Sequence, residues 1–179
     1  RLVCGAQFHE EIKISSELFR NSRFAAVSME PEKIYLWATS RCAQKEYCRA
    51  EMGTKMAAKG ADPDVVEQLL DRLEREKYID DARYARAFVS DKFRFDHWGR
   101  IKIRQALRLK GVDASCIEEA LAETIVEDDY RLALLDFIAA KRRSTKADSD
   151  YALKQKVARS ALSRGYEPQL VFAALSLDD

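Results

Sequence analysis

One helical unit occurs three times in this chain of 179 residues, and that repetition constrains the fold more than any other feature. Each copy carries a glycine directly after a basic residue: Lys59-Gly60, Lys110-Gly111 and Arg164-Gly165. Gly60 and Gly111 are 51 residues apart, and Gly111 and Gly165 are 54 apart. Two residues after each glycine stands an acid: Asp62, Asp113 or Glu167. Apolar residues then recur at spacings of three and four, which places them on one face of a helix.

Each of these glycines predicts the end of one helix and the start of the next. Glycine adopts the left-handed conformation that ends helices at little steric cost. A basic residue just before it interacts favourably with the C-terminal end of the helix dipole. Asp62 and Asp113 can accept hydrogen bonds from the first N–H groups of the following helix. Glu167 is a poorer cap, so we expect a less regular joint in the third copy.

Further apolar stripes predict the first helix of the later copies. Residues 82–95 carry Tyr84, Ala85, Phe88, Val89 and Phe93 on one stripe, and residues 129–142 carry Leu132, Leu135, Ile138 and Ala139. The segment Glu30-Pro31-Glu32 has the features of a helix start. No alternating strand pattern longer than a few residues competes with these helices. We therefore predict an all-α protein with three tandem three-helix modules that form an elongated body.

The expected boundaries follow from the repeat. After an N-terminal extension of residues 1–33, the helical modules should span residues 34–79, 80–127 and 128–179. Residues 1–28 resemble no later segment and begin without Met. Two interpretations stand: Met29 is the natural initiator and the earlier residues belong to an over-long start, or residues 1–28 are an ordinary N-terminal extension.

Three motifs within the repeat resemble those of a known family. The stretch from Tyr78 to Val89, YIDDARYARAFV, resembles the YIDDxRYAxxFV signature of the RecX family. The stretch from Trp98 to Gly111 is similar to the family segment WGxxxIxxxLxxKG, and the segment 156–166 is similar to the family pattern KVxRxxxxRGY. The resemblance covers residues 34–176. It departs at Gly53, inside a predicted helix where glycine costs about 1 kcal/mol relative to Ala, and at Ala161, where the family has leucine.

The resemblance implies a non-catalytic regulator of RecA. RecX proteins bind the helical groove of the active RecA filament, hinder its extension and suppress its ATPase and co-protease activities. The implied partner is therefore the RecA–DNA filament, with a role in DNA repair, recombination and the SOS response. We also expect a monomer, and a direct contact with single- or double-stranded DNA stays open. The alternative is a helix-turn-helix regulator that places the Arg100–Lys110 helix in a DNA groove, which predicts sequence-specific base contacts and a dimer.

Charge is arranged in blocks although the chain is nearly neutral, with 31 Lys and Arg against 30 Asp and Glu. Arg100, Arg104 and Arg108 are four residues apart, so they should form one basic ridge on a helix. Guanidinium groups suit phosphates or acidic protein surfaces, whereas a solvated helix face is the alternative interpretation. The candidate partner- or DNA-binding residues are Arg94, Arg100, Lys102, Arg104, Arg108, Lys110, Lys141, Arg142 and Arg143.

The motif residues themselves are expected to be structural. Aromatic residues at helical spacing favour packing between modules over base stacking. Two acids immediately before a helix favour capping over catalysis. Trp98 stands at a helix entrance, where it is either a packed staple or an exposed anchor for a partner, and packing is favoured. The structural set comprises Tyr78, Ile79, Asp80, Asp81, Tyr84, Phe88, Gly60, Gly111 and Gly165.

The sequence contains no motif of a catalytic or metal site. The cysteines form no CxxC pair and the chain has two histidines, so we expect reduced thiols and no zinc. The motifs GxxxxGKS/T, GxSxG and HExxH do not occur. No apolar stretch approaches the roughly 20 residues that cross a bilayer. We therefore expect a cytoplasmic binding protein that is not an enzyme and uses no metal or cofactor.

Overall fold

The computed structural model describes residues 30–176, and within that range the protein is built from helices alone. The helices are α2 (Pro31–Cys42), α3 (Arg49–Ala57), α4 (Pro63–Arg75), α5 (Asp81–Arg94), α6 (Arg100–Leu109), α7 (Ala114–Thr124), α8 (Glu127–Ser144), α9 (Asp150–Ser163) and α10 (Pro168–Ser176). The predicted all-α class is confirmed. The two interpretations of residues 1–28 concern a segment outside the described residues.

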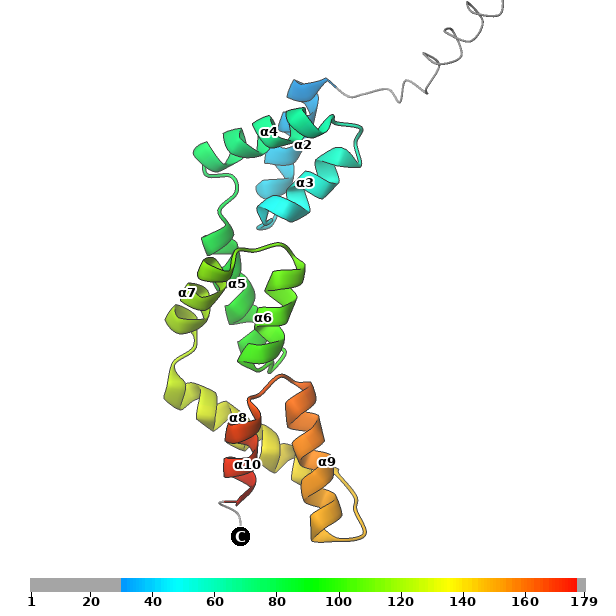
Figure 1. The fold of residues 1–179 in the computed structure, drawn as a ribbon, viewed down its shortest axis with the longest axis vertical. Helices are drawn as coiled ribbons and strands as arrows, with labels where there is room; N and C mark the ends of the chain where they lie inside the picture. Colours follow the sequence, from blue (N-terminus) through cyan, green and yellow to red (C-terminus); the bar gives the residue numbers. More distant parts are fainter. Residues whose placement is uncertain (1–29, 177–179) are drawn as a thin grey trace, which may run out of the picture.

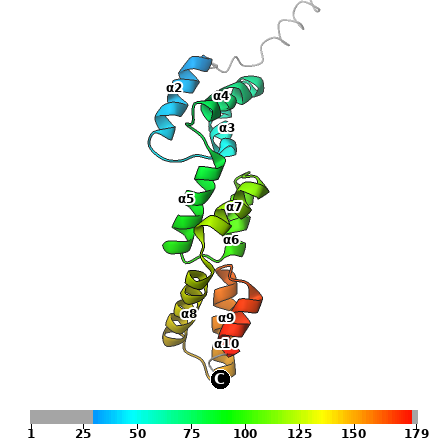
Figure 2. The same ribbon diagram turned by 90° about the vertical axis from the view of Figure 1, so that its left-hand side faces the viewer.

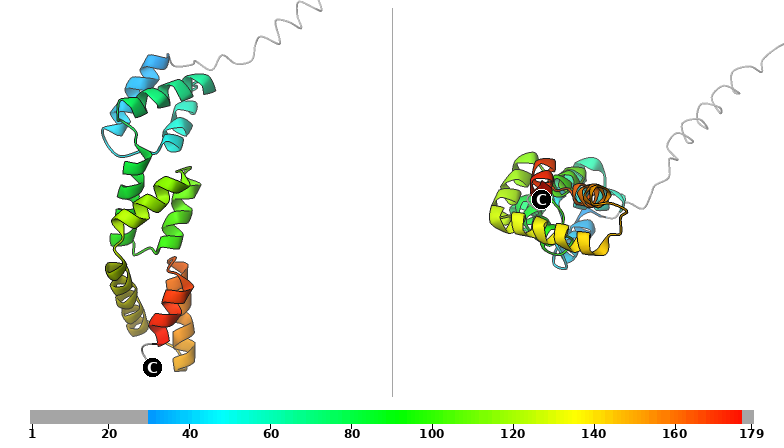
Figure 3. Two further views of the ribbon diagram at one scale, coloured as in Figure 1. Left: turned by 60° about the vertical axis from the view of Figure 1, so that its left-hand side comes forward. Right: turned by 90° about the horizontal axis from the view of Figure 1, so that it is seen from below.

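The helices pack as three successive triads along one long axis (Figure 1). We call α2–α4 module 1, α5–α7 module 2 and α8–α10 module 3. Every pair of helices in extensive contact lies within one of these modules. The view turned by 90° shows the modules stacked end to end, and the view from below shows them lying over one another (Figures 2 and 3). The predicted elongated array of three-helix modules is confirmed.

The helix ends follow the predicted chemistry. Gly60, Gly111 and Gly165 all adopt positive φ, at 84°, 74° and 87°. The Asp62 carboxylate accepts a hydrogen bond from the Asp64 N–H at 3.1 Å, and Asp113 caps α7 in the same way. The third acid has a different partner, because the Glu167 carboxylate accepts a hydrogen bond from the Tyr130 hydroxyl at 2.6 Å. Glu167 thus ties α8 to the start of α10.

The apolar stripe predicted to face the core from α8 is mostly exposed, so this prediction was wrong for most of its residues. Leu132 and Leu135 are 59% and 42% exposed, and Ala139 is exposed as well. The buried residues are Tyr130, Leu134 and Ile138, which lie four apart on the face that contacts α9 and α10. Helix α8 carries apolar residues on two faces, and spacing alone does not distinguish which face meets the core.

Two separate hydrophobic cores stabilise the array. One core lies within module 1 and runs from Ile34 to Ile79. The other is continuous through modules 2 and 3 and includes Cys48 of module 1 at its edge. Burial of apolar surface is the dominant favourable term in folding. Modules 2 and 3 therefore share their main source of stability, whereas module 1 has its own.

The junction between modules 2 and 3 is a close backbone contact. The N–H of Gly99 donates to the carbonyl of Arg164 at 2.8 Å, and the N–H of Ile101 donates to the carbonyl of Gly165 at 3.1 Å. A Cβ on Gly99 would lie 2.2 Å from the carbonyl carbon and oxygen of Gly165. The Trp-Gly motif and the Arg-Gly-Tyr motif therefore meet at this junction, and only glycine fits at position 99.

We expect the Gly99→Ala substitution to destabilise the protein by about 1–3 kcal/mol or more, because the added methyl group overlaps the Gly165 backbone. Urea unfolding followed by circular dichroism measures the change. The control is Gly53→Ala in α3, whose Cβ would meet only the side-chain ends of Leu70 and Val66 at 3.2 and 3.6 Å. Gly53→Ala should alter stability by less than about 1 kcal/mol. Wild-type stability in Gly99→Ala would show that the module 2–3 junction does not depend on this contact.

Candidate functional site

The arginines of the predicted basic ridge lie on α6, but two of them are paired with acids of the same protein. The Arg104 guanidinium donates two hydrogen bonds to the Glu118 carboxylate of α7, at 2.6 and 2.8 Å. Arg100 pairs with Glu127 of α8 at 2.9 Å. Arg108 is exposed and forms no ion pair within the described residues. The ridge thus holds α6 against its neighbours as well as facing solvent, an arrangement that the spacing did not predict.

These pairs shift the titration of their acids. Hydrogen bonding by the Arg104 guanidinium lowers the pKa of Glu118, and hydrogen bonding by Arg100 and then Arg131 lowers the pKa of Glu127. An opposite charge within hydrogen-bond distance favours the ionised carboxylate. Both acids therefore remain charged and reduce the net positive charge along the ridge.

The remaining basic candidates divide between paired and exposed positions. The Lys110 ammonium lies 3.7 Å from the Glu51 carboxylate of module 1, and Arg142 lies 3.7 Å from Asp150. The Lys102 ammonium lies 4.4 Å from the centroid of the Trp98 ring. Arg94 and Arg143 are exposed, and Lys141 is half-buried on α8.

The acidic pair in the motif has two different capping roles. Asp80 is the N-cap of α5 and accepts a hydrogen bond from the Arg83 N–H at 3.0 Å, which lowers the pKa of Asp80. Asp81 accepts a hydrogen bond at 2.7 Å from the N–H of Arg49, the first residue of α3 in module 1. The predicted capping of α5 is confirmed for Asp80, whereas Asp81 instead accepts from the first N–H of a helix in another module.

Core packing of the aromatic motif residues is confirmed only in part. Ile79 and Tyr84 are buried, and Phe88 is half-buried against the core. The prediction was wrong for Tyr78, which is 40% exposed. Tyr78 follows Lys77, which leaves helix α4 with a positive φ of 63°, so the chain turns and buries Ile79 instead.

A contact between cations and an aromatic ring recurs in all three modules. The Lys59 ammonium lies 4.7 Å from the Trp37 ring centroid, and the Lys110 ammonium lies 6.0 Å from that of Phe88. The Arg164 guanidinium carbon lies 5.7 Å from the Phe137 ring centroid. In each module the basic residue before the helix-ending glycine therefore lies over an aromatic ring of the first helix. Such contacts contribute about 0.5–1 kcal/mol at exposed sites.

A second basic residue follows each of these aromatic residues by four positions on the same helix. Arg41 lies over Trp37 at 5.8 Å, Lys92 lies over Phe88 at 5.7 Å, and Lys141 occupies the equivalent position after Phe137. We call these three sets the cation–aromatic units. Unit 1 is Trp37, Arg41 and Lys59; unit 2 is Phe88, Lys92 and Lys110; unit 3 is Phe137, Lys141 and Arg164.

Modules 1 and 2 add a second aromatic residue with cations over its ring. Tyr47 has the Lys45 ammonium at 4.4 Å, and Trp98 has the ammonium groups of Lys102 and Lys92 at 4.4 and 5.1 Å. Both aromatic residues immediately precede the N-cap of the middle helix. Trp98 packs against the core as expected and remains half-buried, with basic groups beside it.

None of the three units was predicted from the sequence, where only Phe88, Lys110 and Lys141 among their members were singled out as candidate binding or structural residues, although part of the signal was present. Trp37 precedes Lys59 by the same separation as Phe88 precedes Lys110, so the repeat that identifies the glycines also aligns the rings. In module 3 the separation from Phe137 to Arg164 is longer, because α8 and α9 are longer helices. The contact between ring and cation joins different helices and could not be derived from spacing within one helix.

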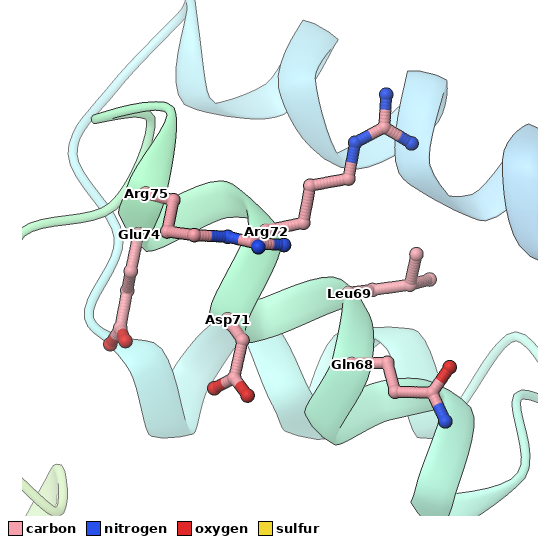
Figure 4. Close-up of a pocket in the computed structure, with 6 residues that line it drawn as sticks. All are labelled: Gln68, Leu69, Asp71, Arg72, Glu74 and Arg75. Carbon is pink, nitrogen blue, oxygen red and sulfur yellow. The ribbon is translucent and has the colours of Figure 1, made fainter.

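A hollow of about 670 Å³ lies on the surface of α4. Three of its charged residues are engaged within module 1: Arg72 pairs with Glu32 and Glu76, while Asp71 and Glu74 pair with Arg49. Figure 4 shows Arg72 reaching toward α2 and the two acids pointing away from it. Within residues 30–176 no group of His, Cys, Asp or Glu side chains is placed to hold a metal ion. No helix in that range has the length and apolar character of a membrane span.

Family comparisons agree with this architecture. The chain matches the family description "RecX, second three-helix domain" over residues 80–121 and "RecX, third three-helix domain" over residues 128–175. It is 31% identical over 135 residues to the regulatory protein RecX of Xanthomonas axonopodis pv. citri, covering 75% of this chain and 81% of that protein. It is 26% identical over 165 residues to the regulatory protein RecX of Geobacillus kaustophilus, covering 92% of this chain but only 60% of that protein.

Solved structures share the fold. The crystal structure of RecX from Lactobacillus salivarius superposes with a TM-score of 0.74 at 19% identity, covering 82% of this chain and 94% of that one. A crystal structure of a regulatory protein RecX gives a TM-score of 0.72 at 22% identity, covering 78% and 68% of the two chains. The fold and these relatives define an all-helical regulatory protein made of tandem three-helix domains. The chain belongs to the RecX family.

We expect the ion pair between Arg104 and Glu118 to make a small, pH-dependent contribution to stability. Because the pKa of Glu118 is lowered on folding, its contribution is present above the unfolded value of about 4.3 and is lost as the pH falls through the folded value. Glu118→Gln should therefore cost up to about 1 kcal/mol at pH 7, a small value because the pair is solvent-screened. The cost should vanish in acid.

Urea unfolding of wild type and Glu118→Gln at a series of pH values measures this difference. The matched control is Glu119→Gln, since Glu119 is exposed on the same helix and forms no ion pair among the described residues. A Glu118→Gln deficit that persists unchanged at low pH would contradict the assignment to the ion pair.

Proposed function

We propose that this protein is a non-catalytic regulator that binds RecA–DNA filaments and inhibits their extension. By this proposal it also suppresses the ATPase and co-protease activities of RecA, and so modulates recombination and the SOS response. Membership of the RecX family supports the regulatory role, and the family resemblance supports RecA as the partner. The protein acts by binding, as a cytoplasmic monomer, without metal or cofactor.

The observation that carries the proposal is the recurrence of one cation–aromatic unit on each module of an elongated body. A filament presents the same protomer surface repeatedly, so a protein with three similar units can engage several protomers at once. Linked binding units gain through effective concentration even when each contact is weak. Aromatic and arginine side chains are also the residues that most often dominate binding energy at protein interfaces.

The proposed binding surface combines the three units with the exposed basic residues nearby. Cations such as Lys59, Lys110 and Arg164 would face acidic side chains of the filament, or phosphates where DNA is reached. The exposed Arg94, Arg108 and Arg143 would extend this surface. Arg100 and Arg104 contribute less, because each guanidinium lies within hydrogen-bond distance of a carboxylate of the same chain, at 2.9 and 2.6 Å. The ion pair of Lys110 with Glu51 is longer, at 3.7 Å.

The direct test is ATP hydrolysis by the cognate RecA on single-stranded DNA, with this protein added well below one copy per RecA protomer. We expect inhibition at these sub-stoichiometric amounts, because one multi-module molecule blocks or bridges neighbouring protomers. Inhibition that requires equimolar protein and disappears when DNA is added in excess would indicate competition for DNA and contradict the proposal.

A triple variant tests the units themselves. Lys59→Gln, Lys110→Gln and Arg164→Gln together should raise the concentration for half-inhibition about tenfold or more, because all three linked contacts are weakened together. The matched control replaces Lys33, Lys77 and Arg159, which are exposed basic residues outside the units, with Gln. Circular dichroism of both variants reports whether the fold is kept. Equal inhibition by the two folded variants would exclude the units as the binding surface.

The helix-turn-helix alternative is less well supported. It requires the exposed face of α6 to enter a DNA groove, yet Arg100 and Arg104 on that helix are held by Glu127 and Glu118. These acids would lie beside the phosphates and repel them. Specific retention of one duplex sequence over scrambled duplexes of equal length would favour this alternative over the filament proposal.

A further inference from the structure

The same positions join module 1 to module 2 and module 2 to module 3. In each junction the N-cap residue of a middle helix, Cys48 or Gly99, donates to the carbonyl that precedes a helix-ending glycine in the next module. The first N–H of that middle helix donates to a side chain near the start of the next module. This acceptor is the Asp81 carboxylate at the first junction, at 2.7 Å, and the Tyr130 hydroxyl at the second, at 3.0 Å.

The junction between modules 2 and 3 is filled with backbone and apolar contacts. Two backbone hydrogen bonds cross it, from Gly99 and Ile101. The fully buried Tyr130 ring lies 5.3 Å from the Tyr166 ring and 5.9 Å from the Phe93 ring, measured between centroids. The connection from α7 to α8 is only residues 125–126, and Ile125 is buried in the shared core. These contacts leave modules 2 and 3 little freedom to rotate relative to each other.

The junction between modules 1 and 2 uses the equivalent positions, but the interactions across it are weaker. The Cys48 thiol replaces the backbone N–H as donor, at 3.4 Å from the Lys110 carbonyl. Among the described residues no backbone–backbone hydrogen bond links α2–α4 to α5–α7. Two partly exposed ion pairs also cross the junction, Glu51 with Lys110 and Glu46 with Arg83. The Arg83 guanidinium further donates to the backbone carbonyls of Lys77 and Tyr78, which follow α4. Exposed ion pairs contribute little net free energy.

Open space lies beside this first junction. Two hollows of about 380 and 370 Å³ are both lined by Ala50, Thr54 and Gly111. The connection between the two modules is short: Ile79 is buried in the core of module 1, and the next residue, Asp80, caps the first helix of module 2. Rotation at this connection would displace few apolar contacts, since Cys48 is, among the described residues, the one buried residue of module 1 that belongs to the core of modules 2 and 3.

We propose that module 1 is an arm that moves at the module 1–2 junction against a rigid body formed by modules 2 and 3, with the Asp81 carboxylate as its latch. Asp81 holds the first N–H of α3 and so fixes the orientation of the arm. The arm carries cation–aromatic unit 1, so its motion changes the spacing of unit 1 from the other two units, whose relative position stays fixed. The motion is independent of the proposed function, and only its consequence for binding depends on that function.

Residual dipolar couplings of backbone amides in the weakly aligned, isotope-labelled full-length protein test the proposal without any partner. We expect modules 2 and 3 to share one alignment tensor, and module 1 to require its own tensor of smaller magnitude. Asp81→Ala should reduce the module 1 tensor further, because the latch is lost. Asp81→Asn keeps an acceptor oxygen for the Arg49 N–H and should behave more like the wild type.

The matched control is Tyr130→Phe, which removes the acceptor at the equivalent position of the second junction but keeps the packed ring. Modules 2 and 3 should keep a common tensor in this variant. Separate tensors for modules 2 and 3 in Tyr130→Phe would overturn the rigid body. One tensor of equal magnitude for all three modules in wild type and Asp81→Ala would overturn the arm. A separate module 1 tensor that Asp81→Ala leaves unchanged would overturn the latch.

Discussion

A glycine with positive φ ends the middle helix of each module. The array depends on this turn, because the carbonyl before the glycine accepts the hydrogen bond that joins one module to the next. At the second junction the turn presents the carbonyls of Arg164 and Gly165 to the first N–H groups of α6. That contact also needs a second glycine, Gly99, since any Cβ there would overlap the Gly165 backbone. Two residues far apart in the sequence thus set how closely modules 2 and 3 approach, and the shared core forms around them.

Charge has two uses in this protein. Acids such as Glu118 and Glu127 pair with Arg104 and Arg100 of α6 and fasten helices to one another. The cations of the three units lie over aromatic rings, and in unit 2 Lys110 and Lys92 also pair with Glu51 and Asp96. A nearly neutral chain can therefore still offer repeated basic positions to an acidic partner.

The two junctions use equivalent positions but differ in what fills them. Backbone hydrogen bonds and a buried tyrosine close the second, whereas a thiol, a carboxylate and exposed ion pairs close the first. Since apolar burial contributes far more than exposed ion pairs, the difference favours motion at one joint only. Repeated architecture with unequal chemistry gives a body that is rigid in one part and adjustable in another.

The sequence by itself determined the all-helical class, the three modules, the helix-ending glycines and the Asp80, Asp62 and Asp113 caps. These features are local: they depend on the conformations of single residues and on the 3.6-residue period, which spacing reports directly. The tertiary structure alone decided which face of α8 is buried, that Tyr78 points outward, and that Arg104 pairs with Glu118. It also decided that Asp81 caps a helix in another module and that a ring from one helix lies under a cation from the next. Each of these depends on which helix faces meet in space, and residues on different helices share no period from which that meeting could be derived.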